Sequence, residues 1–389
     1  MNSLQGTIIT DGKVLKDYVI TWNHDTITEL VPAQEFNGTS QRVTGYIVPG
    51  FIDIHNHGGA GGDFPSGNEE ACRKAIDYHH KNGTTSLQAS TVTADPETLC
   101  ETTKTLAKLC AEGLIEGVHL EGPFVSKDKC GAQDPQYIID PDITLTNQII
   151  EAANGYLNTM TYAPERPGAD KLVAHLIKNG VTPSLGHTSC DIDQAKESFD
   201  IAQEAYNGAG VPTTTHTFNA MPPLNHRDPG PIAPALERAR KGEVILEVIG
   251  DGTHLHPNLV SMIFTVVGAN NIALITDAMA AAGLEDGEYM LGPQEVIVSD
   301  GVARLKRDGA IAGGTSNLHK QLKLGVQQAN IDLVDMITAL TSTPAKVISQ
   351  SRHLDKPIGT LDKGAYADIV VLDQDLELKH VIRRGEKIA

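Results

Sequence analysis

Residues 47–58, Ile-Val-Pro-Gly-Phe-Ile-Asp-Ile-His-Asn-His-Gly, carry the pattern that indicates the fold of this chain. An apolar run leads into His55 and His57, and a glycine-rich segment follows. We expect the run to form a buried strand, in which residues two apart point to the same side, so that both imidazoles can reach one metal ion. A ligand pair at the carboxyl end of a buried parallel strand is where α/β barrels carry their chemistry. The segment therefore indicates a metal-dependent enzyme.

After residue 49, strand-like apolar runs alternate with longer helical patterns. The further strands are predicted at 85–89, 117–120, 160–163, 182–185, 213–218, 244–249 and 272–276. The helices are predicted at 69–82, 96–112, 169–179, 192–204, 257–267, 318–328 and 333–340. Repeated β-then-α order predicts parallel strands with covering helices. With the strand that carries the histidine pair, the count reaches the eight strands of a (β/α)8 TIM-type barrel.

Short β-type runs without helical period occupy both ends of the chain. At the N-terminal end they lie at 7–10, 18–22 and 27–31, and at the C-terminal end at 367–373 and 376–383. We predict that residues 1–48 and 346–389 pair into one small β-sandwich domain. Residues 49–345 are then the metal-dependent catalytic barrel.

Composition narrows the possible partners and the compartment. The formal net charge of the 389 residues is −18, which repels nucleic acid and anionic membranes, so neither is expected as a partner. No apolar stretch approaches the ~20 residues that cross a bilayer, and the first residues lack the pattern of a signal peptide. Five cysteines without a Cys-x-x-Cys pair predict reduced thiols in a cytoplasmic protein.

Metal-capable side chains stand at the ends of several predicted strands. They are Glu121, His187, His216 and Asp277, besides the pair at 55 and 57. Imidazole and carboxylate ligands suit zinc or iron without any cysteine. Isolated histidines are more often structural, and we expect that of His79, His80, His175, His319, His353 and His380. Of His254 and His256, one is expected to contact substrate and the other to be structural.

The segments around these residues resemble the N-acetylglucosamine-6-phosphate deacetylase family of the amidohydrolase superfamily, across essentially the full length. The matching segments are 49–58, 119–124, 185–188, 215–221, 251–254 and 276–278, with a superfamily-like closing strand pair at 359–371. His-Leu-Glu-Gly-Pro-Phe at 119–124 together with Thr-His-Thr-Phe-Asn-Ala-Met at 215–221 is specific to this family. A bare His-x-His would not be.

The resemblance implies a fold, a reaction and a set of site residues. Glu121, His187 and His216 would hold one divalent ion, zinc or iron. His55 and His57, sharing Glu121, would hold a second ion, which gives one or two per subunit. Asp277 would lie beside the reactive water. The implied reaction is hydrolysis of the acetamide of N-acetyl-D-glucosamine 6-phosphate to D-glucosamine 6-phosphate and acetate.

The resemblance also implies contacts to this amino sugar phosphate. They map to Ala132, Asn219, Ala220, Arg227, His254, Ile311, Ala312 and Gly313. Arg227 would reach the active site of the neighbouring subunit in a homodimer. The chain departs from the pattern at Gln133, where some members carry a histidine, so the role of this position in gripping the substrate is left open.

Two other functions compete with this one. A cyclic-amide hydrolase of the dihydroorotase or hydantoinase kind usually bridges two metals with a carboxylated lysine on a barrel strand. Here the corresponding strand end offers Glu121, which argues against that class. A metal-free scaffolding protein on the same fold is the other alternative, because a fold does not assign a function. Such a protein should have lost ligands, yet all six are in place.

Overall fold

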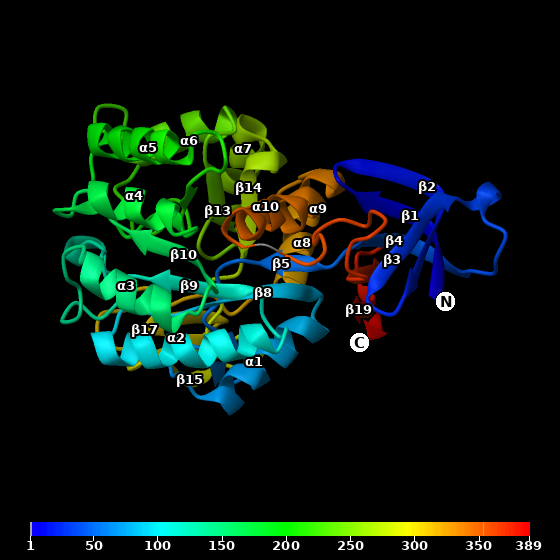
Figure 1. The fold of residues 1–389 in the computed structure, drawn as a ribbon, viewed down its shortest axis with the longest axis horizontal. Helices are drawn as coiled ribbons and strands as arrows, with labels where there is room; N and C mark the ends of the chain where they lie inside the picture. Colours follow the sequence, from blue (N-terminus) through cyan, green and yellow to red (C-terminus); the bar gives the residue numbers. More distant parts are fainter. Residues whose placement is uncertain (1, 353) are drawn as a thin grey trace.

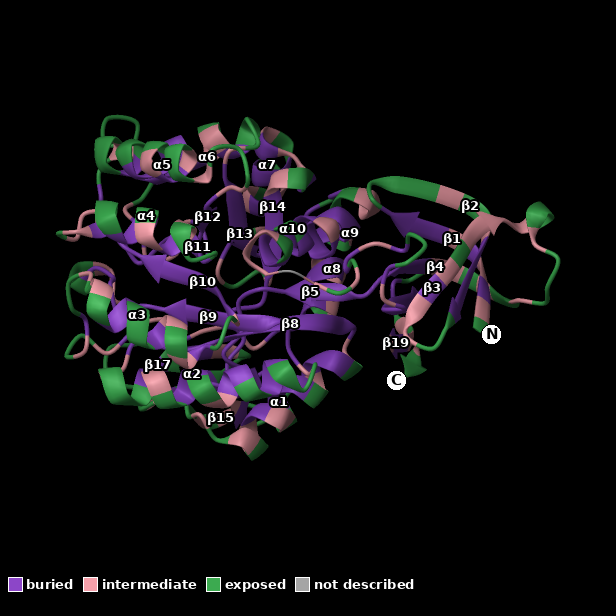
Figure 2. Cartoon of the chain, viewed as in Figure 1, coloured by how far each residue is buried: buried purple, intermediate pink, exposed green. Residues whose placement is uncertain are grey.

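Eight parallel strands form the central sheet, in the order β14-β13-β12-β11-β10-β9-β8-β5. The computed structural model describes residues 2–352 and 354–389. The strands are β5 (Phe51–Asp53), β8 (Thr84–Ser90), β9 (Gly117–Glu121), β10 (Leu157–Tyr162), β11 (Thr182–Leu185), β12 (Thr213–Thr214), β13 (Ile245–Ile249) and β14 (Ile272–Ile275). Every residue in them is buried, because helices cover one face and the barrel interior the other (Figures 1 and 2). The predicted TIM-type barrel is confirmed.

The barrel closes between β5 and β14 just beyond the ends of these strands. Asn56 and Ala278 form a parallel bridge between the two segments. The buried carboxylate of Asp53 accepts hydrogen bonds from the hydroxyl of Thr276 at 2.6 Å and from its backbone N–H at 3.2 Å. This closure fixes the segment after β5 against the segment after β14.

The apolar run at 47–54 was expected to form one strand, but it contributes to two strands in different sheets. Ile47 and Val48 belong to β4 (Gln41–Pro49), outside the barrel, and β5 begins after Gly50. A Cβ at Gly50 would lie 2.0 Å from the Oγ1 atom of Thr85, so glycine is needed where the chain passes from one sheet to the other. β5 ends at Asp53, and the histidine pair therefore follows the strand instead of lying in it.

Helices follow the barrel strands and pack their apolar faces on the outside. The helices are α1 (Glu69–Lys81), α2 (Pro96–Ala111), α3 (Ile143–Ala152), α4 (Ala169–Lys178), α5 (Ile192–Tyr206), α6 (Ile232–Arg240), α7 (Pro257–Val267), α8 (Leu318–Gln327), α9 (Leu333–Leu340) and α10 (Ser342–Ser351). In α4 the buried residues Ala169, Leu172, Val173 and Leu176 recur at i, i+3, i+4 and i+7, as an amphipathic helix requires. The predicted helices are confirmed to within two residues at their ends, whereas α3, α6 and α10 were not predicted. Among the described residues, no helix combines the length and apolarity needed to span a bilayer.

Strands from both ends of the described chain form a second sheet, ordered β20-β19-β18-β4-β1-β2-β3. Besides β4 these are β1 (Asn2–Thr10), β2 (Lys13–Asn23), β3 (Thr26–Pro32), β18 (Ile369–Leu372), β19 (Leu378–Arg383) and β20 (Glu386–Lys387). Ile27 on β3 and Ile382 on β19 lie in one apolar core although β3 is the last strand of the order and β19 the second. The indole N–H of Trp22 also donates to the carbonyl of Gly385 at 3.1 Å. The sheet therefore folds over its own core, in agreement with the predicted small β domain (Figure 1).

The exact domain boundaries stay a prediction. The predicted boundary between residues 345 and 346 falls within α10, which packs against β5, β10, β11 and β14. Val347 and Ile348 share an apolar cluster with Ile52 and Ile245 of barrel strands. In this structure residues 346–351 thus lie with the barrel.

A three-stranded antiparallel sheet lies between β14 and α8 and was not predicted. It consists of β15 (Gly287–Leu291), β16 (Gln294–Ser299) and β17 (Val302–Leu305). Its inner residues pack against Met279 and Ala312, which follow β14 and β17 in the chain. The insertion therefore builds a wall beside the carboxyl end of the barrel. A smaller pair, β6 (Gly58–Gly59) and β7 (Gly62–Asp63), follows the histidine pair.

Candidate metal centre

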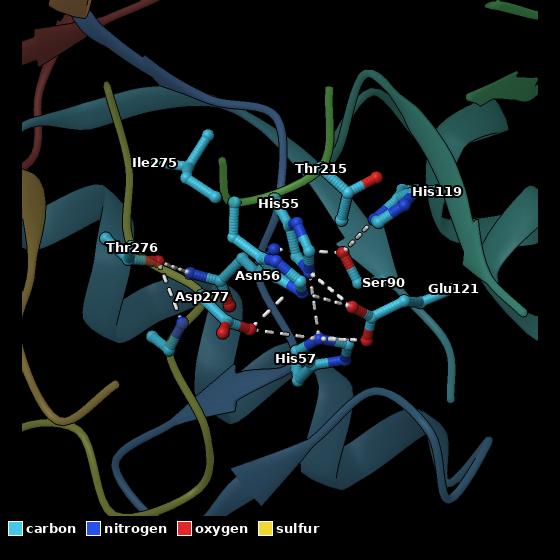
Figure 3. Close-up of polar contacts among 12 residues, drawn as sticks. His55, Asn56, His57, Ser90, His119, Glu121, Thr215, Ile275, Thr276 and Asp277 are labelled. Carbon is cyan, nitrogen blue, oxygen red and sulfur yellow. Dashed lines mark hydrogen bonds and ion pairs between the residues drawn. The ribbon is translucent and has the colours of Figure 1, made fainter. Parts of the chain in front are cut away.

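Side chains from five strand ends converge at the carboxyl end of the barrel, and Figure 3 shows His55, His57, Glu121 and Asp277 among them. They form two groups, in each of which the ligand atoms lie within 4.8 Å of one another. One group is His55, His57 and Asp277, and the other is Glu121, His187 and His216. All six residues are buried. The structure thus brings together the residues that the sequence placed at strand ends.

Glu121, the last residue of β9, lies at the centre of the second group. Its Oε1 atom is 3.0 Å from Nε2 of His187 and 3.0 Å from Nε2 of His216. The two Nε2 atoms are themselves 3.0 Å apart. One carboxylate and two imidazoles at this spacing match the donor set that zinc and iron take in proteins.

The other carboxylate oxygen of Glu121 faces the first group. Its Oε2 atom is 3.2 Å from Nε2 of His57, which lies 3.1 Å from Nε2 of His55. The Oδ1 atom of Asp277 is 3.2 Å and 3.4 Å from these two nitrogens (Figure 3). Glu121 therefore stands between the groups with one oxygen turned to each.

Two of the four histidines have a partner at the outer ring nitrogen, which suits a cation at the inner one. Nδ1 of His187 donates to the carbonyl of Lys129 at 2.8 Å, and Nδ1 of His55 lies 3.0 Å from Oε2 of Glu247. When Nδ1 carries the proton, Nε2 presents its lone pair to the centre of the site. Lone pairs and carboxylates facing one another across about 3 Å are stabilised by a positive ion between them.

The pKa shifts of His57 and Glu121 also favour positive charge at this site. Burial by itself would lower the pKa of His57, but hydrogen bonds to Asp277 and Glu121 outweigh it and raise the pKa to about 10. Burial would raise the pKa of Glu121, yet the surrounding imidazoles hold this pKa well below its usual range. The site thus favours positive charge next to an ionised Glu121.

Three of the six residues have left-handed backbone conformations. The φ angles are 46° at His187, 28° at His216 and 47° at Asp277. Such conformations cost residues other than glycine about 1–3 kcal/mol each and persist where the surroundings impose them. β12, predicted to extend to residue 218, ends at Thr214 because the chain turns here, with positive φ again at Phe218 and Ala220. The turn, and not strand alternation, directs His216 to the site.

A cavity of about 360 Å³ opens above the two groups. His57, Glu121, His187, His216 and Asp277 form part of its wall. Of the predicted substrate contacts, the lining includes Ala132, Asn219, Ala220, His254, Ile311 and Gly313. Ala312 is instead buried against the three-stranded sheet, because successive residues of this segment face opposite sides. Arg227 lies on an exposed loop outside the lining, so the structure of one chain does not bring it to the cavity.

The structure shows which of His254 and His256 faces the cavity, a choice that the sequence left open. The His254 ring lies in the cavity wall and its Nδ1 atom is 2.8 Å from the carboxylate of Asp251, a partner that was not predicted. His256 is exposed and caps α7 by accepting the N–H of Asn258. The residue available to a ligand is therefore His254.

Three further residues support the ligands: Glu247 was not predicted, the role of Gln133 was left open, and His119 lies in a segment already matched to the family. Gln133 donates to Glu121 at 2.7 Å, and Glu247 on β13 contacts His55. His119 lies beneath the site between Ser90 and Thr161. The departure from the family pattern at Gln133 was one signal, and the spacing of His119 and Glu121 on one strand was another. His79 and His80 are buried on α1 as expected, whereas His353 lies outside the described residues.

A family model described as the amidohydrolase family matches residues 46–388. The chain belongs to the amidohydrolase family. This amidohydrolase is 32% identical to the N-acetylglucosamine-6-phosphate deacetylase of Bacillus subtilis, over 97% of this chain and 94% of the relative. It is 30% identical to the N-acetylgalactosamine-6-phosphate deacetylase of Escherichia coli O157:H7, over 97% of both chains. The family predicted from the motifs is confirmed.

A solved structure gives the same result for the fold of the amidohydrolase. It is a mutant N-acetyl-D-glucosamine-6-phosphate deacetylase from Mycobacterium smegmatis in complex with N-acetyl-D-glucosamine-6-phosphate. The TM-score is 0.92 at 35% identity, covering 100% of this chain and 99% of the other. The likeness extends over the barrel and the small β domain together.

Proposed function

We propose that this amidohydrolase hydrolyses the acetamide of N-acetyl-D-glucosamine 6-phosphate to D-glucosamine 6-phosphate and acetate. The observation that carries the proposal is the pair of ligand groups at the floor of the cavity, between which Glu121 stands, with Asp277 in the cavity wall. The names of the relatives and of the solved structure support the substrate class. The galactosamine epimer is the second candidate, because a relative of that specificity matches the whole chain.

An acetamide resists hydrolysis because its carbonyl is resonance-stabilised and its amine is a poor leaving group. When bound at Glu121, His187 and His216, alone or with a second ion at His55 and His57, a divalent ion such as zinc or iron supplies a Lewis acid that lowers the pKa of water from 15.7 towards ~7. The protein must then place the substrate, move a proton and keep the site dry. Its own residues are arranged for these tasks.

Asp277 is the group that moves the proton in this proposal. Its carboxylate lines the cavity and lies 3.2 Å from His57, so it can accept a proton from the attacking water and pass it to the departing nitrogen. His254, held by Asp251, orients the substrate from the cavity wall.

The phosphate requires local attraction, because the net charge of −18 opposes an anionic substrate. We propose that Asn219 and Ala220 contact it and that Arg227 reaches it from the neighbouring subunit of a homodimer. The exposed position of Arg227 outside its own cavity supports this assignment. The cytoplasmic location expected from the reduced cysteines belongs to the same proposal; all five are unpaired.

Metal analysis of the purified protein, coupled to an acetate-release assay, tests the proposal. The assay compares N-acetyl-D-glucosamine 6-phosphate, its galactosamine epimer and the unphosphorylated sugar. We expect bound zinc or iron, release from the phosphorylated sugars and loss of activity after chelation. Release from the plain sugar alone, or full activity of a metal-stripped preparation, would contradict the proposal.

A further inference from the structure

Glu247 is a fully buried carboxylate in the middle of β13. Its Oε2 atom lies 3.0 Å from Nδ1 of His55 and accepts the backbone N–H of His216 at 3.2 Å. Its Oε1 atom has no hydrogen-bond partner among the described residues. The carboxylate therefore touches one residue from each ligand group, from below the cavity.

A buried carboxylate such as Glu247 destabilises the fold unless its contacts compensate for the lost hydration. Burying a carboxylate away from water costs several kcal/mol, and an incompletely paired one is worse than an apolar side chain of the same size. The other residues of β13 are apolar and pack in the core. A barrel strand that needed only stability would carry another apolar residue at 247.

The contact with His55 controls which ring nitrogen faces the site. An acceptor on Nδ1 keeps the proton there and leaves the lone pair on Nε2, which lies 3.1 Å from Nε2 of His57 and 3.4 Å from Asp277. A carboxylate on the outer nitrogen of a ligating histidine also makes the inner nitrogen a stronger ligand, and its loss typically weakens metal binding ~10–100-fold.

We propose that Glu247 is a positioning residue that builds the metal position of His55, His57 and Asp277. It does so by holding His55 in the ligating tautomer, and it thereby determines that the chain binds an ion there in addition to the one at Glu121, His187 and His216. The inference rests on the proposed function only in requiring that the site binds metal.

Zinc titration of the chelator-stripped full chain by equilibrium dialysis tests this inference. We expect two binding phases in the wild type. His57→Asn should remove one phase and His187→Asn the other, which assigns each phase to its group of ligands. Glu247→Leu should weaken the phase that His57→Asn removes by ~10–100-fold and leave the other nearly unchanged. Glu247→Gln keeps an oxygen for the Nδ1 proton and should restore most of the loss, which a purely structural variant would not do.

Glu243→Leu is the matched control, because Glu243 precedes the same strand and pairs with Arg238 away from the site. We expect both of its phases to match the wild type. If Glu247→Leu does not fold, Glu247→Met takes its place and should weaken the His57 phase selectively. Unchanged phases in the apolar Glu247 variant, equal weakening of both phases, no recovery in Glu247→Gln, or a single phase in the wild type would overturn the inference. A wild type that binds no zinc or iron would instead overturn the proposed function.

Discussion

The side-chain amide of Gln133 connects Glu121 to the backbone of Thr93. Its Nε2 donates to Oε2 of Glu121 at 2.7 Å, and its Oε1 accepts the N–H of Thr93 at 2.6 Å. Because each end of the amide has a partner of the opposite kind, its orientation is fixed. Glu121 is therefore held with Oε1 turned to His187 and His216.

Gln133→Leu should weaken metal binding at the group of Glu121, His187 and His216. The isosteric change removes the donor that orients the carboxylate, and such losses cost ~10–100-fold in metal affinity. Competition with a chelator measures the affinity. Gln136→Leu makes the same exchange at an exposed position of the same loop and should bind like the wild type. Equal affinities in all three proteins would rule out this role of Gln133.

Asp277→Asn should lower turnover by ~10²–10⁴ while KM and the metal bound at Glu121, His187 and His216 stay close to the wild type. Asparagine keeps the shape and one oxygen of the side chain but cannot transfer a proton. Steady-state acetate release and metal analysis provide the measurements. A variant with unchanged turnover would exclude Asp277 from the proton transfer.

Arg227→Ala should raise KM for the phosphorylated sugar by about 10- to 100-fold, since a hydrogen bond to a charged group contributes about 1.5–3 kcal/mol. The effect on unphosphorylated N-acetylglucosamine should be much smaller. Similar changes for both sugars would show that Arg227 does not bind the phosphate.

Mixed dimers test whether Arg227 serves the neighbouring site. Arg227→Ala and Asp277→Asn subunits are each impaired, but in a mixed dimer one cavity receives an intact Asp277 and an Arg227 from its neighbour. We expect mixing under exchange conditions to restore activity at low phosphorylated substrate. No restoration in dimers of verified mixed composition would contradict the intersubunit role.

His79→Gln should flatten the pH dependence of stability between pH 6.5 and 4. His79 is fully buried on α1 and its Nε2 donates to the carbonyl of Gly58 at 2.9 Å. Burial lowers the pKa of His79 to about 4, so below pH 6.5 the unfolded chain binds a proton that the folded chain does not. The wild type should therefore lose about 3 kcal/mol of unfolding free energy at this residue as the pH falls. Urea denaturation of the wild type and of His79→Gln at several pH values measures the free energy of unfolding. A difference between the two proteins that does not change with pH would contradict the prediction.

The ligands could be predicted because polar residues interrupt apolar runs at strand ends, where a barrel gathers them. Glu247 could not, because a carboxylate within Ile-Leu-Glu-Val-Ile gives no sign of facing the barrel interior. The early end of β12 was equally hidden, since Thr-His-Thr-Phe at 215–218 favours a strand and the turn depends on contacts with β13, such as the N–H of Thr217 on the carbonyl of Glu247.

The three-stranded insertion did have a signal in the sequence. Asp300 and Gly301 form the two-residue turn between β16 and β17, with φ angles of 52° and 73°. Asp-Gly between alternating apolar residues is a strong indication of a hairpin. Helix α6 was not predicted, because prolines at 231 and 234 indicate a loop when only the sequence is known. In the structure both lie at the start of the helix, where proline is tolerated.

The pairing of β4 with β18 has a consequence for how the molecule is made. Ile47 lies opposite Val371, so more than 300 residues, including the whole barrel, must leave the ribosome before these two strands can meet. Until then β4 offers a bare edge and β1 to β3 lack part of their core. A chain that lacks β18 to β20 should thus keep all six ligand residues and nevertheless aggregate or bind chaperones.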